Sequence, residues 1–235
     1  MNVAIIAAAG RGTRAGGGQA KQFRELRGVP IIIHTLQRFE QCRTIGEIIV
    51  VVPAHDAEEF SASAEKFRLR KLARVVAGGE TRTETVWRGL SAVSASEGFA
   101  GVVAVHDGVR PFVMPGEIDR TVLAAEESGA AILAAPAVDT IKEGELRTGV
   151  PHVARTLERA RLWHAQTPQC FRYELLRRAY EHALAEGIEA TDDSALVERL
   201  GTEVRIVEGG AHNIKLTTAQ DFALAEIFIK SPDFG

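Results

Sequence analysis

A stretch near the amino terminus combines glycines with spaced cations. An apolar run, Val3 to Ala8, leads into the segment Gly10 to Gly18, which contains Arg14, and Lys21 follows shortly after it. Small residues let backbone N–H groups approach a polyphosphate closely, and the two cations bring positive charge to the same place. The layout therefore predicts a phosphate-binding loop and, with it, a nucleotide ligand.

Two commoner glycine-rich signatures fit this loop less well. Gly10, Gly12 and Ala15 satisfy the dinucleotide fingerprint, but more glycine follows where a helix should begin, and the acid expected about twenty residues on is missing. The Walker pattern fails because Gly18 stands where a lysine is required. The other alternative is a surface turn whose arginines are only solvated. The glycines directly follow a strand whose apolar sequence is typical of a buried strand, and this position favours the phosphate-binding interpretation.

A carboxylate follows a second apolar run. His106 and Asp107 come directly after Val102 to Val105, and Arg110 lies three residues beyond the aspartate. A hard carboxylate oxygen at the end of a strand, close to a polyphosphate, suits Mg²⁺. Asp107 is therefore the predicted metal ligand. The alternatives are a helix or turn cap and a simple ion pair between Asp107 and Arg110.

A third strand end carries small and polar residues. Paired glycines ending at Gly79 follow the run Val75 to Ala77, and Arg82 and Thr85 come soon after. Glycines admit a base or ribose close to the backbone, and the two polar side chains offer contacts to it. The pattern predicts a nucleoside pocket, which is compatible with a helix cap at Thr81 or Thr83.

Further polar residues have simpler explanations when taken alone. Lys215, just before the last helical stretch, is most simply a surface lysine. Asp192 and Asp193 begin a helical pattern, where capping and the helix dipole account for acids in the first turn. The histidines at 106, 164 and 212 have no partners at zinc spacing, and no nucleophile elbow is present. Cations, glycines and one carboxylate are the set expected for phosphoryl or nucleotidyl transfer.

The elements that must position these residues alternate along the chain. Unbroken apolar runs indicate strands buried on both faces, and they occur at 3–8, 48–52, 75–77, 102–105 and 130–135. A further strand is expected at 204–207, where only Arg205 interrupts the apolar residues. Helical stretches between them cover 31–40, 83–95, 115–128, 173–186, 192–200 and 218–229. This alternation predicts a doubly wound α/β sheet whose ligands bind beyond the carboxyl ends of the strands. The polar excursion at about 138–166 predicts a protruding hairpin arm within a single domain over 1–235.

Composition excludes several classes of function. The chain has 235 residues, 46% of them hydrophobic, and a formal net charge of −3, so a nucleic-acid-coating surface is not expected. No apolar run approaches the ~18 residues of a membrane-spanning helix. The two cysteines, Cys42 and Cys170, lie far apart without metal-ligand spacing and are expected to be buried. We expect a cytoplasmic protein with small anionic partners, no nucleic acid and no membrane.

Eight segments, taken in order, resemble one enzyme family over nearly the whole chain. They are AAAGRGTR, AKQF, GGETR, HDGVRPF, DTIK, RARLWHAQTPQCF, TDDSALVE and NIKLT, and they resemble the 2-C-methyl-D-erythritol 4-phosphate cytidylyltransferases. The resemblance implies a reaction of CTP with the sugar-alcohol phosphate to give 4-diphosphocytidyl-2-C-methyl-D-erythritol and pyrophosphate, in the non-mevalonate isoprenoid pathway, with Mg²⁺. It also implies a Rossmann-like, mostly parallel sheet of the nucleotide-diphospho-sugar transferase type, in a homodimer with exchanged β-arms.

The resemblance also implies roles residue by residue. Arg14, Lys21 and Lys215 would stabilise charge at the α-phosphate, with Asp107 as the fourth catalytic residue and the one nearest Mg²⁺. Thr140 and Arg159 would hold the sugar phosphate from the arm of the neighbouring subunit. The nucleotide site would comprise Ala8, Ala9, Gly10, Gly12, Gly79, Arg82, Thr85, Asp107 and Gly108.

The sequence departs from the family pattern at a few positions and leaves rival functions open. Gly108 and Val109 replace the usual small pair after the aspartate, and His212 stands where an acid is common. A sister cytidylyltransferase for ribitol or ribulose 5-phosphate shares the lysine loop, the aspartate and the TPQ segment, although Arg159 followed by LWHAQTPQ favours methylerythritol phosphate. A nucleotide-binding module without catalysis is the other alternative, because a fold alone does not specify an activity.

Overall fold

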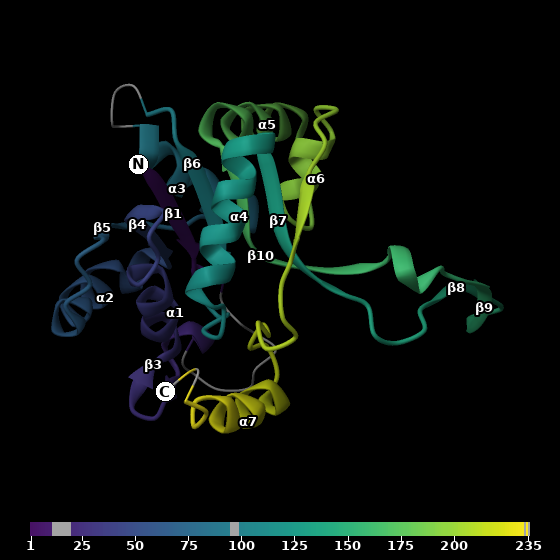
Figure 1. The fold of residues 1–235 in the computed structure, drawn as a ribbon, viewed down its shortest axis with the longest axis horizontal. Helices are drawn as coiled ribbons and strands as arrows, with labels where there is room; N and C mark the ends of the chain where they lie inside the picture. The colour runs from purple at the N-terminus through teal and green to yellow at the C-terminus, as the bar shows by residue number, and fades with distance from the viewer. Residues whose placement is uncertain (11–19, 95–98, 233, 235) are drawn as a thin grey trace.

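The computed structural model describes residues 1–10, 20–94, 99–232 and 234. Within these residues, seven strands form the central sheet (Figure 1), and they are β1 (Asn2–Ala7), β4 (Ile45–Val52), β5 (Leu72–Ala77), β6 (Val102–Asp107), β7 (Ala130–Pro136), β10 (Trp163–Arg172) and β11 (Arg205–Glu208). Two short ribbons accompany the sheet, β2 (Glu25–Leu26) with β3 (Val29–Pro30), and β8 (Lys142–Arg147) with β9 (Val150–Thr156).

Helices cover both faces of the sheet, as three-layer α/β folds require. They are α1 (Ile31–Glu40), α2 (Ala57–Ala64), α3 (Arg82–Ser94), α4 (Pro115–Ser128), α5 (Tyr173–Glu186), α6 (Asp193–Glu198) and α7 (Ala219–Phe228), with short 3-10 turns η2 (Lys21–Phe23), η3 (Ala54–Asp56), η4 (Glu65–Phe67) and η5 (Arg159–Arg161). One core joins α1, α2 and α4 to the sheet, and a second core joins α3, α5 and α6 to the opposite face.

Alternating side chains of the central strands build these two cores. In β1, Ala4 and Ile6 belong to the first core, whereas Val3 and Ile5 belong to the second. Each of the four is at most 2% exposed. Because both faces of the strand are covered, its sequence is apolar without interruption, which is the pattern that predicted it.

The strand order is β11-β7-β10-β6-β1-β4-β5, and all neighbours are parallel except at β10. The sequence-based expectation of a doubly wound, mostly parallel sheet is confirmed. After β1 the chain adds strands on one side, and it then returns to place β6 on the other side of β1. Ligands bind at such switch points, beyond the carboxyl ends of the strands.

The antiparallel strand β10 was not expected from the sequence. It pairs with β6 on one side and β7 on the other. Its first residues, Trp163 to Gln166, fall in the stretch that the sequence assigned to the arm, and they lie instead in the main sheet.

A smaller apolar cluster lies beyond the carboxyl ends of the strands, where α7 closes that end of the molecule (Figure 1). Phe112 packs edge-on against Phe228 and Phe234, with ring centroids 5.4 and 5.3 Å apart. Leu216 is fully buried in the same cluster. This packing fixes the two chain segments that carry Asp107 and Lys215.

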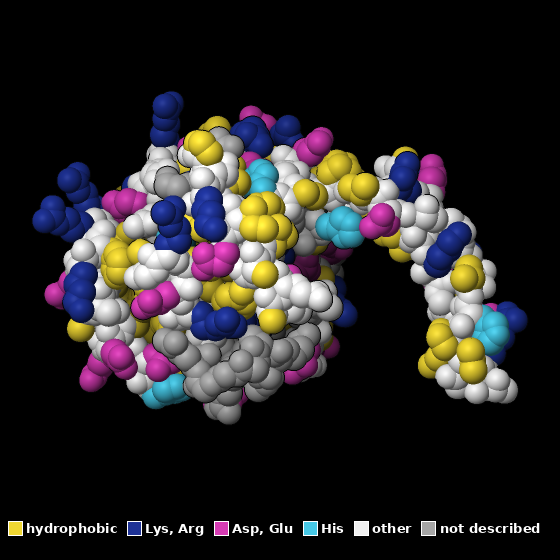
Figure 2. All heavy atoms as spheres, turned by 90° about the horizontal axis from the view of Figure 1, so that it is seen from below, with side chains coloured by type: hydrophobic (Ala, Val, Ile, Leu, Met, Phe, Trp, Pro, Cys, Tyr) yellow, Lys and Arg dark blue, Asp and Glu magenta, His cyan; other side chains and the backbone are white. Residues whose placement is uncertain are grey.

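The hairpin of β8 and β9 stands away from the body of the molecule (Figures 1 and 2). Every residue of both strands is exposed. Leu146 and Val153 are 77% and 62% exposed, so apolar side chains on this hairpin have no covering partner in the described part of the chain.

Candidate active site

A cavity of about 640 Å³ opens at the carboxyl ends of β1, β5 and β6. Its walls come from the three strand ends that the sequence singled out, together with the segment before α7. The lining residues are Ala7, Ala8, Ala9, Gly10, Lys21, Gln22, Gly79, Glu80, Thr81, Arg82, Thr85, Asp107, Val109, Lys215 and Thr217.

The strand ends approach one another closely because glycines stand at the contacts. The N–H of Gly108 donates to the carbonyl of Ala7 at 2.9 Å, and a Cβ on Gly108 would lie 2.8 Å from the Cβ of Ala8. A Cβ on Gly78 would lie 2.2 Å from the Cβ of Ala9. Gly108 was predicted for the nucleotide site; it is not among the described residues that line the cavity, and it brings β1 and β6 together.

Asp107 is the last residue of β6 and carries two cations. Its Oδ2 lies 3.0 Å from Nζ of Lys215 and 3.1 Å from Nε of Arg110. Burial alone would raise the pKa of this carboxyl, but Lys215, Arg110 and Arg82 outweigh burial and hold the pKa well below its usual range. Asp107 is therefore ionised at neutral pH, and the ion pair with Arg110 that the sequence left open as an alternative is present.

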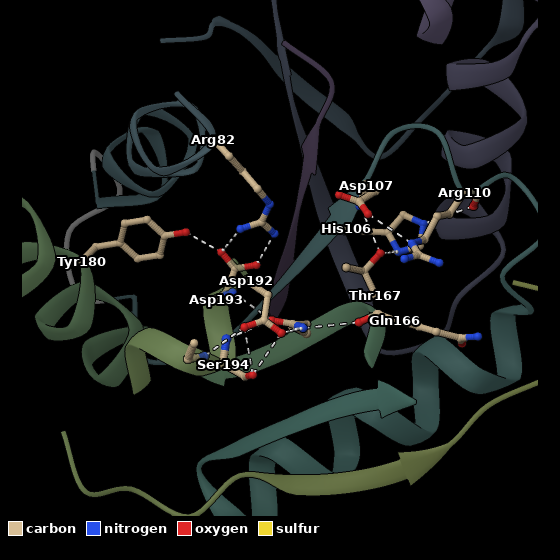
Figure 3. A network of polar contacts seen from close by, with 12 residues as sticks. Arg82, His106, Asp107, Arg110, Gln166, Thr167, Tyr180, Asp192, Asp193 and Ser194 are labelled. Atoms are coloured by element: carbon tan, nitrogen blue, oxygen red, sulfur yellow. Dashed lines mark hydrogen bonds and ion pairs between the residues drawn. The ribbon is translucent and has the colours of Figure 1, made fainter. Parts of the chain in front are cut away.

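A buried polar chain fixes the backbone around Asp107 (Figure 3). The N–H of Asp107 donates to Thr167 Oγ1 at 3.1 Å, and Thr167 Oγ1 lies 3.0 Å from Nδ1 of His106. His106 Nε2 lies 3.2 Å from the carbonyl of Arg110, which can only accept, so Nε2 carries the proton and Nδ1 accepts from Thr167. Burial lowers the pKa of His106 to about 4, which keeps the ring neutral in this role.

Hydrogen bonds hold the segment that carries Lys215 on both sides of this residue. The N–H of Leu216 donates to the carbonyl of Val109 at 2.9 Å, and Arg110 Nη1 donates to the carbonyl of Asn213 at 2.8 Å. His212, which stands where the family commonly has an acid, donates from Nε2 to Glu117 at 3.2 Å. The departure at this position therefore leaves a hydrogen-bonded support for the loop in place.

Arg82, at the start of α3, lines the cavity and is held by Asp193 of α6 (Figure 3). Its Nη1 and Nη2 atoms donate to the two carboxylate oxygens at 2.9 and 2.6 Å. Thr81 accepts from the N–H of Glu84 at 3.1 Å, so the cap of α3 lies at Thr81, one of the two positions expected from the sequence. Capping accounts for Asp192, which accepts from the N–H of Ala195, but it does not account for Asp193.

The remaining predicted residues fall into three groups. Ala8, Ala9, Gly10, Lys21, Gly79 and Thr85 line the cavity. Gly12 and Arg14 lie outside the described residues. Thr140 and Arg159 do not line it; both are exposed at the base of the arm, where Nη1 of Arg159 donates to the carbonyl of Val138 at 2.8 Å.

The donor set for a metal consists of one firmly placed carboxylate. Among residues 1–10, 20–94 and 99–232, no three His, Cys, Asp or Glu side chains gather as a metal site. Mg²⁺ commonly takes one or two carboxylates and completes its shell with substrate phosphates and water. Asp107 beside a cavity that Lys21, Arg82 and Lys215 also line fits such a shared site and does not fit an all-protein metal cage.

Comparisons with known proteins decide the family. The family model described as IspD: 2-C-methyl-D-erythritol 4-phosphate cytidylyltransferase matches residues 2–231. The chain belongs to this family. It is thereby a member of a family of nucleotidyltransferase enzymes, as the sequence resemblance implied.

Relatives support the assignment over their whole length. The chain is 42% identical to the 2-C-methyl-D-erythritol 4-phosphate cytidylyltransferase of Syntrophus aciditrophicus, covering 98% of this chain and 97% of the relative. It is 44% identical to that of Bacillus velezensis, covering 97% and 96%. The crystal structure of 4-diphosphocytidyl-2C-methyl-D-erythritol synthase from Anaerococcus prevotii superposes with a TM-score of 0.83 at 30% identity, covering 98% and 96%. These matches do not favour the pentose phosphate alternative.

The roles of three residues of the site were missed in the sequence. Thr167 and Gln169 lie in the TPQ segment, which was noticed only as part of the resemblance, and Asp193 was attributed to helix capping and the helix dipole. Each acts through a partner far along the chain, such as Arg82, which is 111 residues from Asp193. For Thr167 and Gln169, the available signal was a pair of polar residues with no local structural role in the sequence pattern.

Proposed function

We propose that this chain joins CTP and 2-C-methyl-D-erythritol 4-phosphate to form 4-diphosphocytidyl-2-C-methyl-D-erythritol and pyrophosphate. A phosphate oxygen of the sugar-alcohol phosphate attacks the α-phosphorus of CTP, and the bond from that phosphorus to the bridging oxygen of the β-phosphate breaks. The observation that carries the proposal is a single cavity in which Asp107 and Lys215 lie 3.0 Å apart and Arg82 lines another wall.

The cations of the cavity address the main obstacle to this reaction. The attacking phosphate monoester has a second pKa of about 6 and is largely ionised at neutral pH, so it needs no general base. Repulsion between this dianion and the triphosphate must be overcome instead. Lys21 and Lys215 line the cavity and supply positive charge there. Arg14 joins them in the proposal by resemblance to the family.

Asp107 would hold the divalent cation that the family resemblance implies. When bound, Mg²⁺ would supply charge neutralisation for the triphosphate and order its oxygens. The protein prepares for this by keeping the Asp107 carboxyl ionised through Lys215 and Arg110. The same cations compensate the carboxylate before a metal and a nucleotide arrive.

The site for the sugar phosphate is proposed to be shared between two copies of the chain. Thr140 and Arg159 lie at the base of the exposed hairpin, away from the residues that line the cavity of their own chain. The apolar side chains of Leu146 and Val153 on that hairpin are typical of an interaction surface. A homodimer with exchanged arms would cover them and bring the partner's Arg159 to the cavity.

The proposed location is the cytoplasm. Cys42 and Cys170 are both free and buried, as predicted, which is compatible with a reducing compartment. Within the described residues, no helix combines the length and apolarity that a membrane crossing needs.

A coupled assay of pyrophosphate release tests the proposal. With CTP and Mg²⁺, turnover is expected with 2-C-methyl-D-erythritol 4-phosphate and not with ribitol or ribulose 5-phosphate. Turnover of a pentose phosphate alone would overturn the assignment of the substrate. Binding of CTP without turnover of any of the three would support the alternative of a nucleotide-binding module.

A further inference from the structure

Arg82 is held by a carboxylate to which the proposed reaction assigns no role. The side chain of Asp193 is fully buried, whereas that of Arg82 is 30% exposed and reaches the cavity. The two side chains meet through a pair of parallel hydrogen bonds of 2.9 and 2.6 Å. Such a bidentate pair fixes the plane of the guanidinium as well as its position. Arg82 is therefore presented to the cavity in one orientation.

Asp193 is anchored more elaborately than the start of a short helix requires (Figure 3). Oε1 of Gln169 accepts from the N–H groups of Asp193 and Ser194 at 3.0 and 2.9 Å. The hydroxyl of Tyr180 donates to Asp193 Oδ1. The cap of α6 is already provided by Asp192. The additional contacts fix the carboxylate of Asp193 and, through it, Arg82.

The ion pair determines which part of a nucleotide Arg82 is suited to meet. Burial would lower the pKa of Arg82, but the attraction of Asp193 raises it overall, so the guanidinium stays charged within the pair. Neutralised by Asp193, it contributes little net charge toward a phosphate. A guanidinium has five N–H donors, and the pair uses two of them. Donors within a neutral pair suit uncharged acceptors, such as a base carbonyl or a ribose hydroxyl.

We infer that Asp193, supported by Tyr180 and Gln169, is a positioning residue that presents Arg82 to the uncharged nucleoside part of CTP. The inference rests on the proposed function, in which CTP is the nucleotide. It divides the cavity into a nucleoside wall at Arg82 and a phosphate wall at Lys21 and Lys215.

Asp193→Asn tests this inference. The variant keeps the shape of the side chain and removes the charge that orients Arg82. Because the nucleoside does not react, its binding energy is the same in the ground state and the transition state. The KM and the Kd for CTP should each rise about tenfold, while kcat at saturating CTP and the KM for the sugar phosphate stay unchanged. The Kd for CMP should rise by the same factor as that for CTP.

Two further variants separate positioning from folding. Tyr180→Phe keeps the ion pair and removes one donor to Asp193, so it should shift the Kd for CTP in the same direction by a smaller factor. Asp119→Ala is the control for folding. The carboxylate of Asp119 accepts from the N–H groups of Arg43 and Thr44, and none of these residues lines the cavity. This variant should lower the unfolding midpoint and leave the KM for CTP unchanged.

The outcomes distinguish the inference from the proposed function. Failure of the wild-type protein to bind CTP, measured by calorimetry, would overturn the proposed function. Binding by the wild type with equally tight binding by Asp193→Asn would overturn the inference alone, as would a fall in kcat at constant KM. If Asp193→Asn does not fold, Tyr180→Phe decides, because an unchanged Kd for CTP in that variant contradicts the positioning role.

Discussion

Replacing His106 by glutamine should flatten the pH dependence of stability between pH 7 and pH 5. In the native protein His106 is fully buried, donates to the carbonyl of Arg110 and accepts from Thr167. Burial lowers its pKa from 6.5 to about 4. The unfolded chain therefore binds a proton at a pH where the folded protein does not, and protonation favours unfolding.

The sign and the size of the effect follow from these two pKa values. The stability contributed by neutral His106 is fully present above about pH 6.5 and is lost as the pH falls toward 4. At pH 5 the loss reaches about 2 kcal/mol, since each pH unit below the unfolded pKa costs about 1.4 kcal/mol. Asp107 and Glu117, whose pKa values are also lowered, contribute only at lower pH, where carboxylates titrate.

Urea denaturation of the wild type and of His106→Gln at several pH values between 5 and 8 measures the effect. The glutamine amide can donate to Arg110 and accept from Thr167 but does not titrate. The wild type should lose about 2 kcal/mol more than the variant between pH 7 and pH 5. Burial also lowers the pKa of His34, but its contribution to the pH dependence is the same in the wild type and the variant and cancels in the difference. Parallel curves, or an NMR titration placing the pKa of His106 near 6.5, would refute the reasoning.

Three further predictions concern turnover. Lys215→Met should lower kcat about 10²- to 10³-fold with little change in the urea midpoint, since this side chain is 41% exposed; a large loss of stability with intact turnover would contradict the role of Lys215. Chelation by EDTA should abolish turnover and leave the melting temperature unchanged, because the metal would be held largely by the substrate, and a melting point that falls with EDTA would argue for a structural metal. Mixed dimers of Lys21→Ala and Arg159→Ala chains should recover activity, since one of their two sites is intact; isolated mixed dimers without activity would argue against exchanged arms.

Strands that are buried on both faces are predicted directly by their apolar sequence. The runs that became β1, β6 and β7 are apolar throughout, and their edges were placed within two residues. The beginning of β10, by contrast, is exposed at Trp163 to Ala165, and it joins the sheet through backbone pairing with β7. Backbone pairing leaves no signature in side-chain pattern, so this strand was taken for part of the arm.

The candidate site divides in the same way. Asp107 ends β6, and Gly79 and Lys21 come after β5 and β1. The rule for parallel sheets brings such residues to one edge without further information. Asp193 has a sufficient local explanation as an acid in the first turn of a helix, and its pairing with Arg82 exists only once α3 and α6 pack together. Because capping and the helix dipole already explain Asp193 locally, nothing in the sequence pointed to its tertiary contact.

The strand β10 contacts both halves of the cavity. Thr167 accepts from the backbone of Asp107 on the phosphate side, and Gln169, two residues along, accepts from the backbone of Asp193 on the nucleoside side. Hydrogen bonds to the same strand therefore hold both walls of the cavity, and the distance between the two walls is fixed. The affinity of an inhibitor that links a cytidine-like group to an anion should depend strongly on the length of its linker. If the linker is lengthened by one bond, the two groups cannot both reach their walls of the cavity.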